Sequence, residues 1–316
     1  MRGKVLAWLE AFLSNRYQRV VLNGFYSQWT PVISGVPQGT ILGPILFLYY
    51  INDLPGQVVS IAKLFADDCK LYHSVHTRED CITLQRDLDS LAAWSRAWLL
   101  KFSAEKCVVL RIRAALDFTY FLEGQPLTTV TEQKDLGIII SDDLKPSCHI
   151  DYICGKANQR LGLIKRCFTN KSPIVLSQLY RALVRPILET NSAAWNPWLI
   201  KDIDRLDKVQ RRCERLCSQD LKLESLTDRR KRADMRETYK ILHHKYKLNP
   251  DELFHQTGKP LHGHSKKLAK QQCRTDIRKQ FFSNRVVSPW NDLPEEVVSA
   301  PSADTFKTRL ELSSEG

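Results

Sequence analysis

The chain has 316 residues, of which 43% are apolar and 26% charged, a composition that is ordinary for a folded protein of two or three domains. No stretch reaches the roughly 18 consecutive apolar residues that a membrane span needs. No secretory cleavage pattern follows the first apolar residues, and the nine cysteines are odd in number and irregularly spaced. These features exclude a secreted or membrane-spanning protein, so we expect an intracellular one, nuclear or cytoplasmic.

The positive charge is confined to the second half of the chain. Lysines and arginines number 47 against 35 aspartates and glutamates, a net charge of +12. Residues 1–150 hold 15 basic and 15 acidic side chains, whereas residues 151–316 hold 32 and 20. Such a bias favours a surface for a polyanion, most simply nucleic acid. The alternative is a solvated basic helical domain with no ligand.

The first 55 residues predict a helix, a hairpin, a loop and a second helix. Apolar residues recur at helical spacing over Gly3–Leu13. Asn23 and Gly24 separate two β-prone runs, which is a strong hairpin signal because both central residues of a type I′ turn need positive φ. The loop Ser34–Gly39 is rich in glycine and proline, and an apolar helix is expected from about Ile41 to Asp53.

The next elements form a second hairpin and a long helix. Val58–Phe65 is apolar and β-branched and predicts a buried strand, which resumes at Cys69–Tyr72 after an interruption that includes two acids. Thr77 predicts the N-cap of a helix. That helix carries one apolar face, made of Leu84, Leu88, Leu91, Trp94 and Trp98. Extended runs follow at Cys107–Ile112, Thr119–Leu122 and Leu136–Ile140.

Strand signals fade after about Ser147, and the pattern becomes helical. Helices are predicted over His149–Phe168, Pro173–Glu189 and Lys201–Ser218, followed by basic helical stretches and loops. We therefore expect an α+β chain with three parts. Their predicted bounds are residues 1–145, 146–220 and 221–316.

The adjacent acids Asp67 and Asp68 are the first candidate site. An isolated acidic pair is usually a solvated turn, but here both flanks are apolar, which brings the acids to the tip of a hairpin. Two like charges held together repel unless a cation neutralises them, and Mg²⁺ takes carboxylates together with substrate phosphates. Such a tip is a reasonable half of a two-metal phosphoryl-transfer site.

The loop Ser34–Gly39 is the second candidate. Its glycines allow another molecule to approach the backbone closely, and the helix that follows directs backbone N–H groups and a positive dipole toward it. The loop would suit contact with a phosphate or a base. The alternative is a simple turn at a helix start.

The two candidates together resemble a known family. Residues 34–55 (SGVPQGTILGPILFLYYINDLP) and 62–72 (AKLFADDCKLY) resemble motifs B and C of reverse transcriptases from LINE-type (non-LTR) retrotransposons, close to the jockey and chicken-repeat groups. Residues 94–112 resemble motif D and residues 134–150 resemble motif E. Similarity to the thumb and the C-terminal end of these enzymes continues at residues 176–198, 206–216 and 285–310.

The resemblance implies a fold and a chemistry. It implies part of a right-hand polymerase palm, with an antiparallel sheet and helices, then a helical thumb and a basic helical C-terminal region. It also implies RNA-templated DNA synthesis with Mg²⁺, an RNA template, a DNA primer and a dNTP. The matching positions are Asp67 and Asp68 as metal ligands, Phe65 and Ala66 beside them, Gly35, Pro37, Gln38 and Gly39 at the template and nucleotide, and Lys106 at the departing pyrophosphate.

One part of the family pattern is missing from the sequence. Motif A, a strand that carries a further metal-binding aspartate, should precede the first helix, and the chain begins directly before that helix. We therefore expect negligible polymerase activity from this chain alone. A second chain that supplies the missing part of the palm is one possibility. The main alternative function is a non-catalytic nucleic-acid-binding protein derived from a retrotransposon.

Smaller signals lie in the basic half. Four cations of one helix, Lys208, Arg211, Arg212 and Arg215, are candidates for contact with a nucleic-acid backbone, and the run Asp228–Arg232 begins another basic helix. The alternative for both is a solvated face. Cys213 and Cys217 lie within one predicted helix, and the downstream His243 and His244 are adjacent instead of three to five residues apart as in a usual zinc motif, so we interpret the cysteines as structural.

Overall fold

The computed structural model describes residues 2–113, 116–170, 172–217, 221, 223–257 and 263–313. It contains two compact units. Unit 1 comprises residues 1–109 and 114–129, and unit 2 comprises residues 110–113 and 130–316. The expected mixture of helix and sheet is confirmed. The division at residues 145 and 220 stays a prediction, and several of its bounds, together with the predicted helix end at Ser218, lie outside the described residues.

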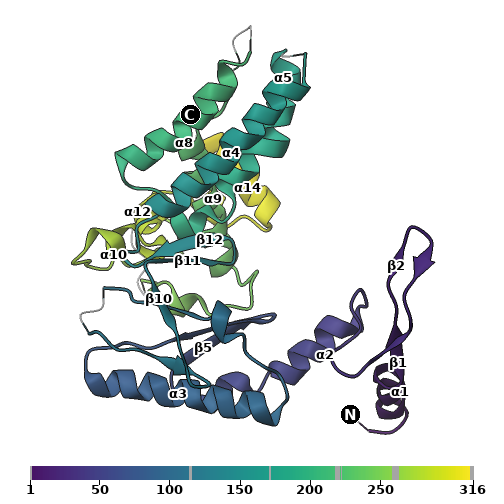
Figure 1. Cartoon of the computed structure of the whole chain (residues 1–316). Coiled ribbons are helices and arrows are strands. Elements are labelled where there is room, and N and C mark those ends of the chain that lie inside the picture. Colours follow the sequence, from purple (N-terminus) through teal and green to yellow (C-terminus); the bar gives the residue numbers. More distant parts are fainter. Residues whose placement is uncertain are drawn as a thin grey trace. The chain divides into compact units, whose positions relative to one another are not determined.

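The described residues of unit 1 form short strands, α-helices and short 3₁₀ helices (Figure 1). Its helical elements are α1 (Lys4–Leu13), α2 (Leu42–Ile51), η1 (Leu54–Gln57), α3 (Arg78–Ala97) and η2 (Ala104–Lys106). Its strands are β1 (Arg16–Gln18), β2 (Val21–Leu22), β3 (Phe25–Tyr26), β4 (Thr30–Val32), β5 (Ile61–Phe65), β6 (Asp68–Tyr72), β8 (Phe121–Leu122) and β9 (Gln125–Pro126).

Two further strands, β7 (Val108–Leu110) and β10 (Thr128–Val130), lie where the chain passes from one unit to the other and pair with each other. Unit 2 adds the hairpin of β11 (Glu132–Asp135) and β12 (Ile138–Ser141). Its helices are α4 (Ser147–Cys167), α5 (Pro173–Leu179), η3 (Tyr180–Val184), α6 (Arg185–Glu189), α7 (Ser192–Trp195), α8 (Ile200–Glu214), α9 (Leu226–Leu242), η4 (Pro250–Glu252), α10 (Asp276–Gln280), α11 (Phe282–Arg285), α12 (Val287–Asn291), α13 (Glu295–Val298) and α14 (Ala303–Ser313).

Local chemistry accounts for the turns of unit 1. Asn23 and Gly24 both have positive φ, 50° and 82°, and join β2 to β3 in the predicted tight hairpin. The Thr77 side chain accepts from the backbone N–H of Asp80, and the Asp80 carboxylate accepts from the backbone N–H of Thr77. This reciprocal capping box confirms the predicted start of α3.

Two predictions of regular structure need correction. The run Leu136–Ile140 is not one extended segment, because Leu136 and Gly137 take positive φ and form the turn between β11 and β12. The predicted helix Pro173–Glu189 is continuous but not α-helical throughout, because Tyr180–Val184 form the π-helical turn η3. Pro186 is the second residue of α6, which follows that turn, and a wider turn accommodates its ring and its missing N–H.

The cores of the two units differ in size. Unit 2 has one large cluster built on α4, α5, α8 and α9, and a second around Trp290, Tyr239 and Phe306. Unit 1 has two small clusters on the inner face of α3. None of the described residues of α1 is buried, and α2 buries only Gly43 and Ile51. No described helix is long and apolar enough to cross a membrane.

Candidate functional site

The tip of the β5–β6 hairpin presents the two acids, as predicted. Phe65 pairs with Asp68, so Ala66 and Asp67 form the turn and Asp68 is the first residue of β6. Ala66 has a φ of 52°, a left-handed conformation that is strained for a residue with a Cβ. Both acids are exposed. The structure therefore gives two adjacent carboxylates that a ligand can reach.

The inner face of the hairpin is fixed to α3 (Figure 1). Leu64 and Leu71 pack against a buried cluster that includes Leu91 and Trp94 of α3. At the start of β5, the buried carboxylate of Asp87 accepts the backbone N–H groups of Val59 and Ser60 at 2.9 and 2.8 Å. The tip is thus held by both packing and charge-assisted hydrogen bonds.

The pKa of Asp87 lies below its usual range. Burial raises it, but the hydrogen bonds from Ser60 and from the backbone of Val59 and Ser60 outweigh burial and keep the group ionised. Sequence reasoning missed this residue, since a single acid on a helix is normally solvated. Its position beside the apolar face of the predicted helix was the only sequence evidence that its carboxylate could be buried.

The outer face of the hairpin is open. Ile61, Phe65 and Tyr72 are 54%, 64% and 43% exposed, and among the described residues no third strand pairs with β5 or β6. The strand predicted within Val58–Phe65 is confirmed as β5, but the prediction that it is buried is wrong. An apolar run in the sequence shows that a strand can be buried. Whether it is buried depends on other elements that pack against its two faces.

The loop 34–39 is organised by contacts within unit 1. Gly35 and Gly39 take φ values of 78° and 77°, which glycine adopts freely. The Arg16 guanidinium donates to the carbonyl of Gly35 at 2.6 Å and to that of Leu13 at 2.8 Å. Arg16 therefore joins the end of α1 to the loop, a contact over 19 residues that sequence reasoning missed.

The junction between the loop and α2 is tightly closed. The Thr40 hydroxyl donates to the carbonyl of Pro37 at 3.0 Å and accepts the N–H of Gly43 at 3.0 Å. A Cβ on Gly43 would lie 2.6 Å from the Pro37 carbonyl oxygen, so only glycine fits there. Gln38 stays exposed. The loop is a shaped backbone surface with one free amide side chain.

Helix α2 connects the loop to the hairpin. The loop precedes its first residue, Leu42, and Phe47 packs against the same cluster as Leu64 and Leu71. Among the described residues, no hydrogen bond joins residues 34–39 to residues 65–68. The meeting of loop and hairpin tip over one substrate stays a prediction.

Lys106 ends η2 and is exposed. Burial raises the pKa of the Cys69 thiol, and the charge of the Cys107 thiol raises it further. Cys69 and Cys107 directly follow two predicted site residues, Asp68 and Lys106. The placement of Lys106 beside the acids stays a prediction.

The four predicted cations of unit 2 lie on the exposed side of α8. Lys208, Arg211, Arg212 and Arg215 are all exposed, whereas Leu206, Val209, Gln210 and Cys213 on the other side are buried. The Arg212 guanidinium donates to the amide oxygen of Asn158 in α4 at 2.8 Å. This bond holds one cation of α8 beside α4.

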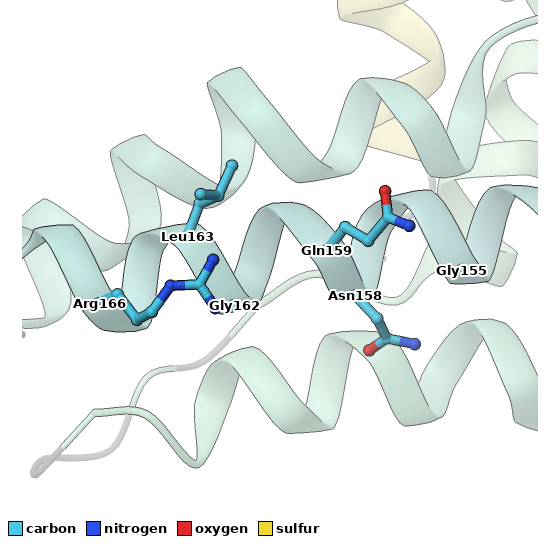
Figure 2. Close-up of a pocket in the computed structure, with 6 residues that line it drawn as sticks. All are labelled: Gly155, Asn158, Gln159, Gly162, Leu163 and Arg166. Carbon is cyan, nitrogen blue, oxygen red and sulfur yellow. The ribbon is translucent and has the colours of Figure 1, made fainter.

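A groove of about 510 Å³ lies along α4 (Figure 2). In the figure, Asn158 and Gln159 point to opposite sides of the helix, and the Arg166 side chain lies over Gly162. A Cβ on Gly155 would meet nothing within 4 Å. Sequence reasoning missed this groove, although two glycines seven residues apart in a helix were a usable signal. The lining residues are Gly155, Asn158, Gln159, Gly162, Leu163 and Arg166.

The basic run Asp228–Arg232 of α9 is used inside unit 2. Arg229 donates to Glu189 at 3.0 Å, and Arg232 pairs with Glu224. Arg230 is buried, donates to Asn196 at 3.1 Å, and has its pKa lowered by burial. Most of this run therefore stabilises the fold, and its interpretation as a phosphate-tracking or solvated surface is wrong for these three arginines.

Comparison with known proteins gives a family. Residues 2–140 match the reverse transcriptase (RNA-dependent DNA polymerase) family. The chain is 27% identical over 223 residues to the probable RNA-directed DNA polymerase from transposon BS of Drosophila melanogaster, covering 66% of the chain and 25% of that protein. No solved structure matches the chain.

Residues 2–140, which we call the reverse transcriptase segment, are therefore similar to the RNA-directed DNA polymerases of LINE-type elements. A second relative is the RNA-directed DNA polymerase from the mobile element jockey of Drosophila melanogaster, 26% identical over 194 residues, covering 57% of the chain and 21% of that protein. The chain thus spans about a quarter of the length of the curated relatives that it matches. The family expected from the two motif blocks is confirmed.

The donor chemistry of the reverse transcriptase segment fits a divalent metal in part. Mg²⁺ takes carboxylate oxygens together with phosphate oxygens, and the hairpin tip offers two exposed carboxylates. Among the described residues, no group of three or more His, Cys, Asp or Glu side chains could enclose an ion. Asp67 and Asp68 would therefore need oxygens from a substrate or from further polypeptide to complete the coordination.

Proposed function

We propose that this chain contributes the rear of the palm and the thumb to an RNA-directed DNA polymerase. In this proposal Asp67 and Asp68 hold Mg²⁺, which would supply charge neutralisation for nucleotidyl transfer. The observation that carries it is the strained hairpin tip, which presents two exposed carboxylates in a segment that matches the reverse transcriptase family.

The other candidate residues take roles around that tip. Gly35, Pro37, Gln38 and Gly39 would face the template base and the incoming nucleotide, because this loop offers shaped backbone and an exposed amide. Phe65 and Ala66 fix the approach to the acids. Lys106 would stabilise the negative charge that develops on departing pyrophosphate.

Unit 2 would hold the template–primer duplex. The exposed cations of α8 and the glycine-lined groove of α4 lie on helices that pack together, and Arg212 joins them. Cations, amide side chains and bare helix backbone suit a sugar–phosphate surface. We assign residues 1–145 to the palm, 146–220 to the thumb and 221–316 to a basic C-terminal region.

The decisive experiment is primer extension on an RNA template with Mg²⁺. The chain alone should give negligible product, because two carboxylates leave the metal pair under-neutralised and each 1.4 kcal/mol of barrier is about tenfold in rate. Robust product that Asp67→Ala abolishes would contradict this expectation of inactivity.

A chimera tests the positive half of the proposal. The segment that precedes the matched region of the jockey polymerase should be fused in front of residue 2, to supply a further strand and a further aspartate. Mg²⁺-dependent product that is lost in Asp67→Asn and in Asp68→Asn is the expected result. A chimera that folds and binds template–primer but stays inactive would contradict the proposed metal role.

A non-catalytic nucleic-acid-binding protein is the second candidate function. The observation that favours it is the exposed cation set of unit 2, which does not involve the acids of the hairpin. Binding of template–primer that is unchanged in an Asp67→Asn, Asp68→Asn variant, together with an inactive chimera, would favour this candidate over the polymerase.

A further inference from the structure

A second basic surface lies in unit 2, apart in sequence from α4 and α8. Between residues 263 and 281 there are six lysines and arginines and one carboxylate, Asp276. Lys266 and Lys267 are half-buried, and Lys266 donates to the carbonyl of Leu242 at 3.4 Å. The other four cations, Lys270, Arg274, Arg278 and Lys279, are exposed.

The segment that carries these cations has one regular outer side. From residue 269 to residue 275 the side chains alternate between half-buried and exposed, and α10 begins at Asp276. The exposed positions of the whole segment are Lys270, Gln272, Arg274, Asp276 and Arg278. At roughly 3.3 Å per residue of extended chain, the backbone from Lys270 to Arg274 can span up to about 13 Å. A line of cations at this spacing matches a phosphate backbone better than a single small anion.

Both ends of the segment are fixed. The Asn291 side chain donates to the carbonyl of Leu268 at 2.8 Å and accepts its N–H at 2.9 Å. At the other end, the Asn284 side chain donates to the carbonyl of Arg278 at 2.8 Å, and the Thr275 hydroxyl caps α10 by accepting the N–H of Arg278. The cations therefore project from ordered backbone, which lowers the entropy lost on binding.

The exposed cations are not neutralised by the protein. Within the described part of the chain, none of the four lies in an ion pair. The contacts of Lys270 and Arg278 are to neutral groups, the hydroxyl of Ser288 at 3.5 Å and the amide oxygen of Gln271 at 3.3 Å. Three arginines of α9, by contrast, are paired with carboxylates or buried: Arg229, Arg230 and Arg232.

An exposed aromatic ring adjoins the cations. Phe281 is 49% exposed, and the Arg278 guanidinium lies 5.4 Å from the centre of its ring. A basic track beside an aromatic ring is the usual combination for single-stranded nucleic acid, in which unpaired bases can stack. We infer that residues 270–281 bind single-stranded nucleic acid, with Lys270, Arg274 and Arg278 on phosphates and Phe281 against a base. This site goes beyond the proposed polymerase site and does not depend on the metal.

The test is a fluorescence anisotropy titration of the full chain with a labelled 20-nucleotide single strand, as RNA and as DNA, at several salt concentrations. Replacing Lys270, Arg274 and Arg278 by glutamine should reduce the slope of log affinity against log salt by about two, at roughly 0.7 per lost phosphate contact. Affinity at 0.1 M salt should fall roughly 100-fold on the same arithmetic. Phe281→Ser alone should weaken binding about tenfold, whereas Phe281→Tyr should bind normally.

A matched variant separates local contact from net charge. Lys231, Lys247 and Lys307 are exposed in the same unit, and their replacement by glutamine removes the same charge. Equal loss in both triple variants would overturn the inference, as would loss of affinity for a 20-base-pair duplex with none for the single strand. A double variant of Lys270 and Arg274, which keeps the Arg278 bond to Gln271, should give about two thirds of the slope change if the triple variant unfolds.

The proposed thumb surface has its own readout. Replacing Lys208, Arg211 and Arg215 by glutamine should weaken duplex binding and leave the single-strand affinity of residues 270–281 unchanged. An inactive chimera with intact single-strand binding would sink the polymerase proposal alone, and the reverse result would sink this inference alone.

Discussion

The two units of the chain use apolar residues in opposite ways. Unit 2 buries its large side chains in two clusters and pairs Arg285 with the buried carboxylate of Asp234. Unit 1 carries the reverse transcriptase motifs, yet Trp8, Ile45, Tyr49 and Phe65 are all exposed there. A helix that is apolar on all sides, such as α2, is normally enclosed. The comparison teaches that the large buried cores and the reverse transcriptase motifs lie in different parts of this chain, and that unit 1 alone should be the less stable structure.

The largest expected effect tests that contrast directly. Trp290 is fully buried, stacks on Phe306 and donates its indole N–H to the carbonyl of Lys266 at 2.8 Å. Trp290→Ala should lower the free energy of unfolding of unit 2 by about 4 kcal/mol, through lost burial, a cavity and an unpaired carbonyl. Phe65→Ala, in unit 1, should change stability by less than about 0.5 kcal/mol. Urea unfolding followed by circular dichroism measures both, and equal effects would break the comparison.

The buried ion pair of unit 2 gives the next effect. The Arg285 guanidinium donates to both carboxylate oxygens of Asp234 at 2.9 Å and to the carbonyl of Ala193 at 2.8 Å. Burial raises the pKa of Asp234, against the lowering effect of Arg285. Arg285→Met leaves that carboxyl without a partner and should cost about 3 kcal/mol. The double variant Arg285→Met, Asp234→Leu should regain most of this loss in the same urea measurement. No recovery would show that the pair does not explain the loss.

Acid should weaken unit 2 through His149. Burial lowers the pKa of this imidazole to about 4, and its Nδ1 accepts the backbone N–H of Ile139 at 3.2 Å. The unfolded state takes up a proton near pH 6.5, whereas the folded state does so only near pH 4, so stability falls as pH falls through that window. The loss should reach about 2 kcal/mol between pH 6.5 and 5, at about 1.4 kcal/mol per unit.

The control for this prediction is His149→Asn, which can keep an acceptor for the Ile139 N–H but cannot titrate. His243 and His264 also have pKa values lowered by burial, so the difference between the two proteins, and not the slope of either, reports His149. Parallel pH profiles of the free energy of unfolding would refute its role.

Sequence predicts those features of the chain that depend on neighbouring residues. The turn at Asn23 and Gly24, the cap at Thr77 and the acids at the hairpin tip each follow from a few adjacent residues, and all three are confirmed. The reverse transcriptase family was predicted from two sequence blocks, residues 34–55 and 62–72, which resemble motifs B and C in the order that the family has. Local chemistry and spacing were sufficient in each case.

The features that were not predicted depend on residues far apart in the chain. The Arg16 contact with Gly35 spans 19 residues and the Arg229 contact with Glu189 spans 40. No local sequence pattern indicates either contact. A run of arginines looks the same in sequence whether its partners are phosphates or buried carboxylates. The exposure of β5 likewise depends on what lies over it, which an apolar run does not record.

The smallest expected effect comes from two glycines of α4, which should influence both stability and binding. Gly155 and Gly162 lie inside α4, where alanine is favoured over glycine by roughly 0.5–1 kcal/mol per position. A Cβ would meet nothing within 4 Å at Gly155 and only the Arg166 guanidinium, at 3.9 Å, at Gly162. Gly155→Ala, Gly162→Ala should therefore raise the free energy of unfolding of unit 2 by about 1–2 kcal/mol, measured in urea.

The same double variant should bind template–primer duplex more weakly, because two methyl groups would stand where the groove brings backbone close to a ligand. Ala157→Gly is the reverse control, since Ala157 lies on the buried side of α4 and its replacement should destabilise without touching the groove. If the alanine variant were more stable and bound duplex unchanged, the glycines would have no role in binding. The groove would then be an accident of helix composition, and α8 alone would carry the thumb's contact with the duplex.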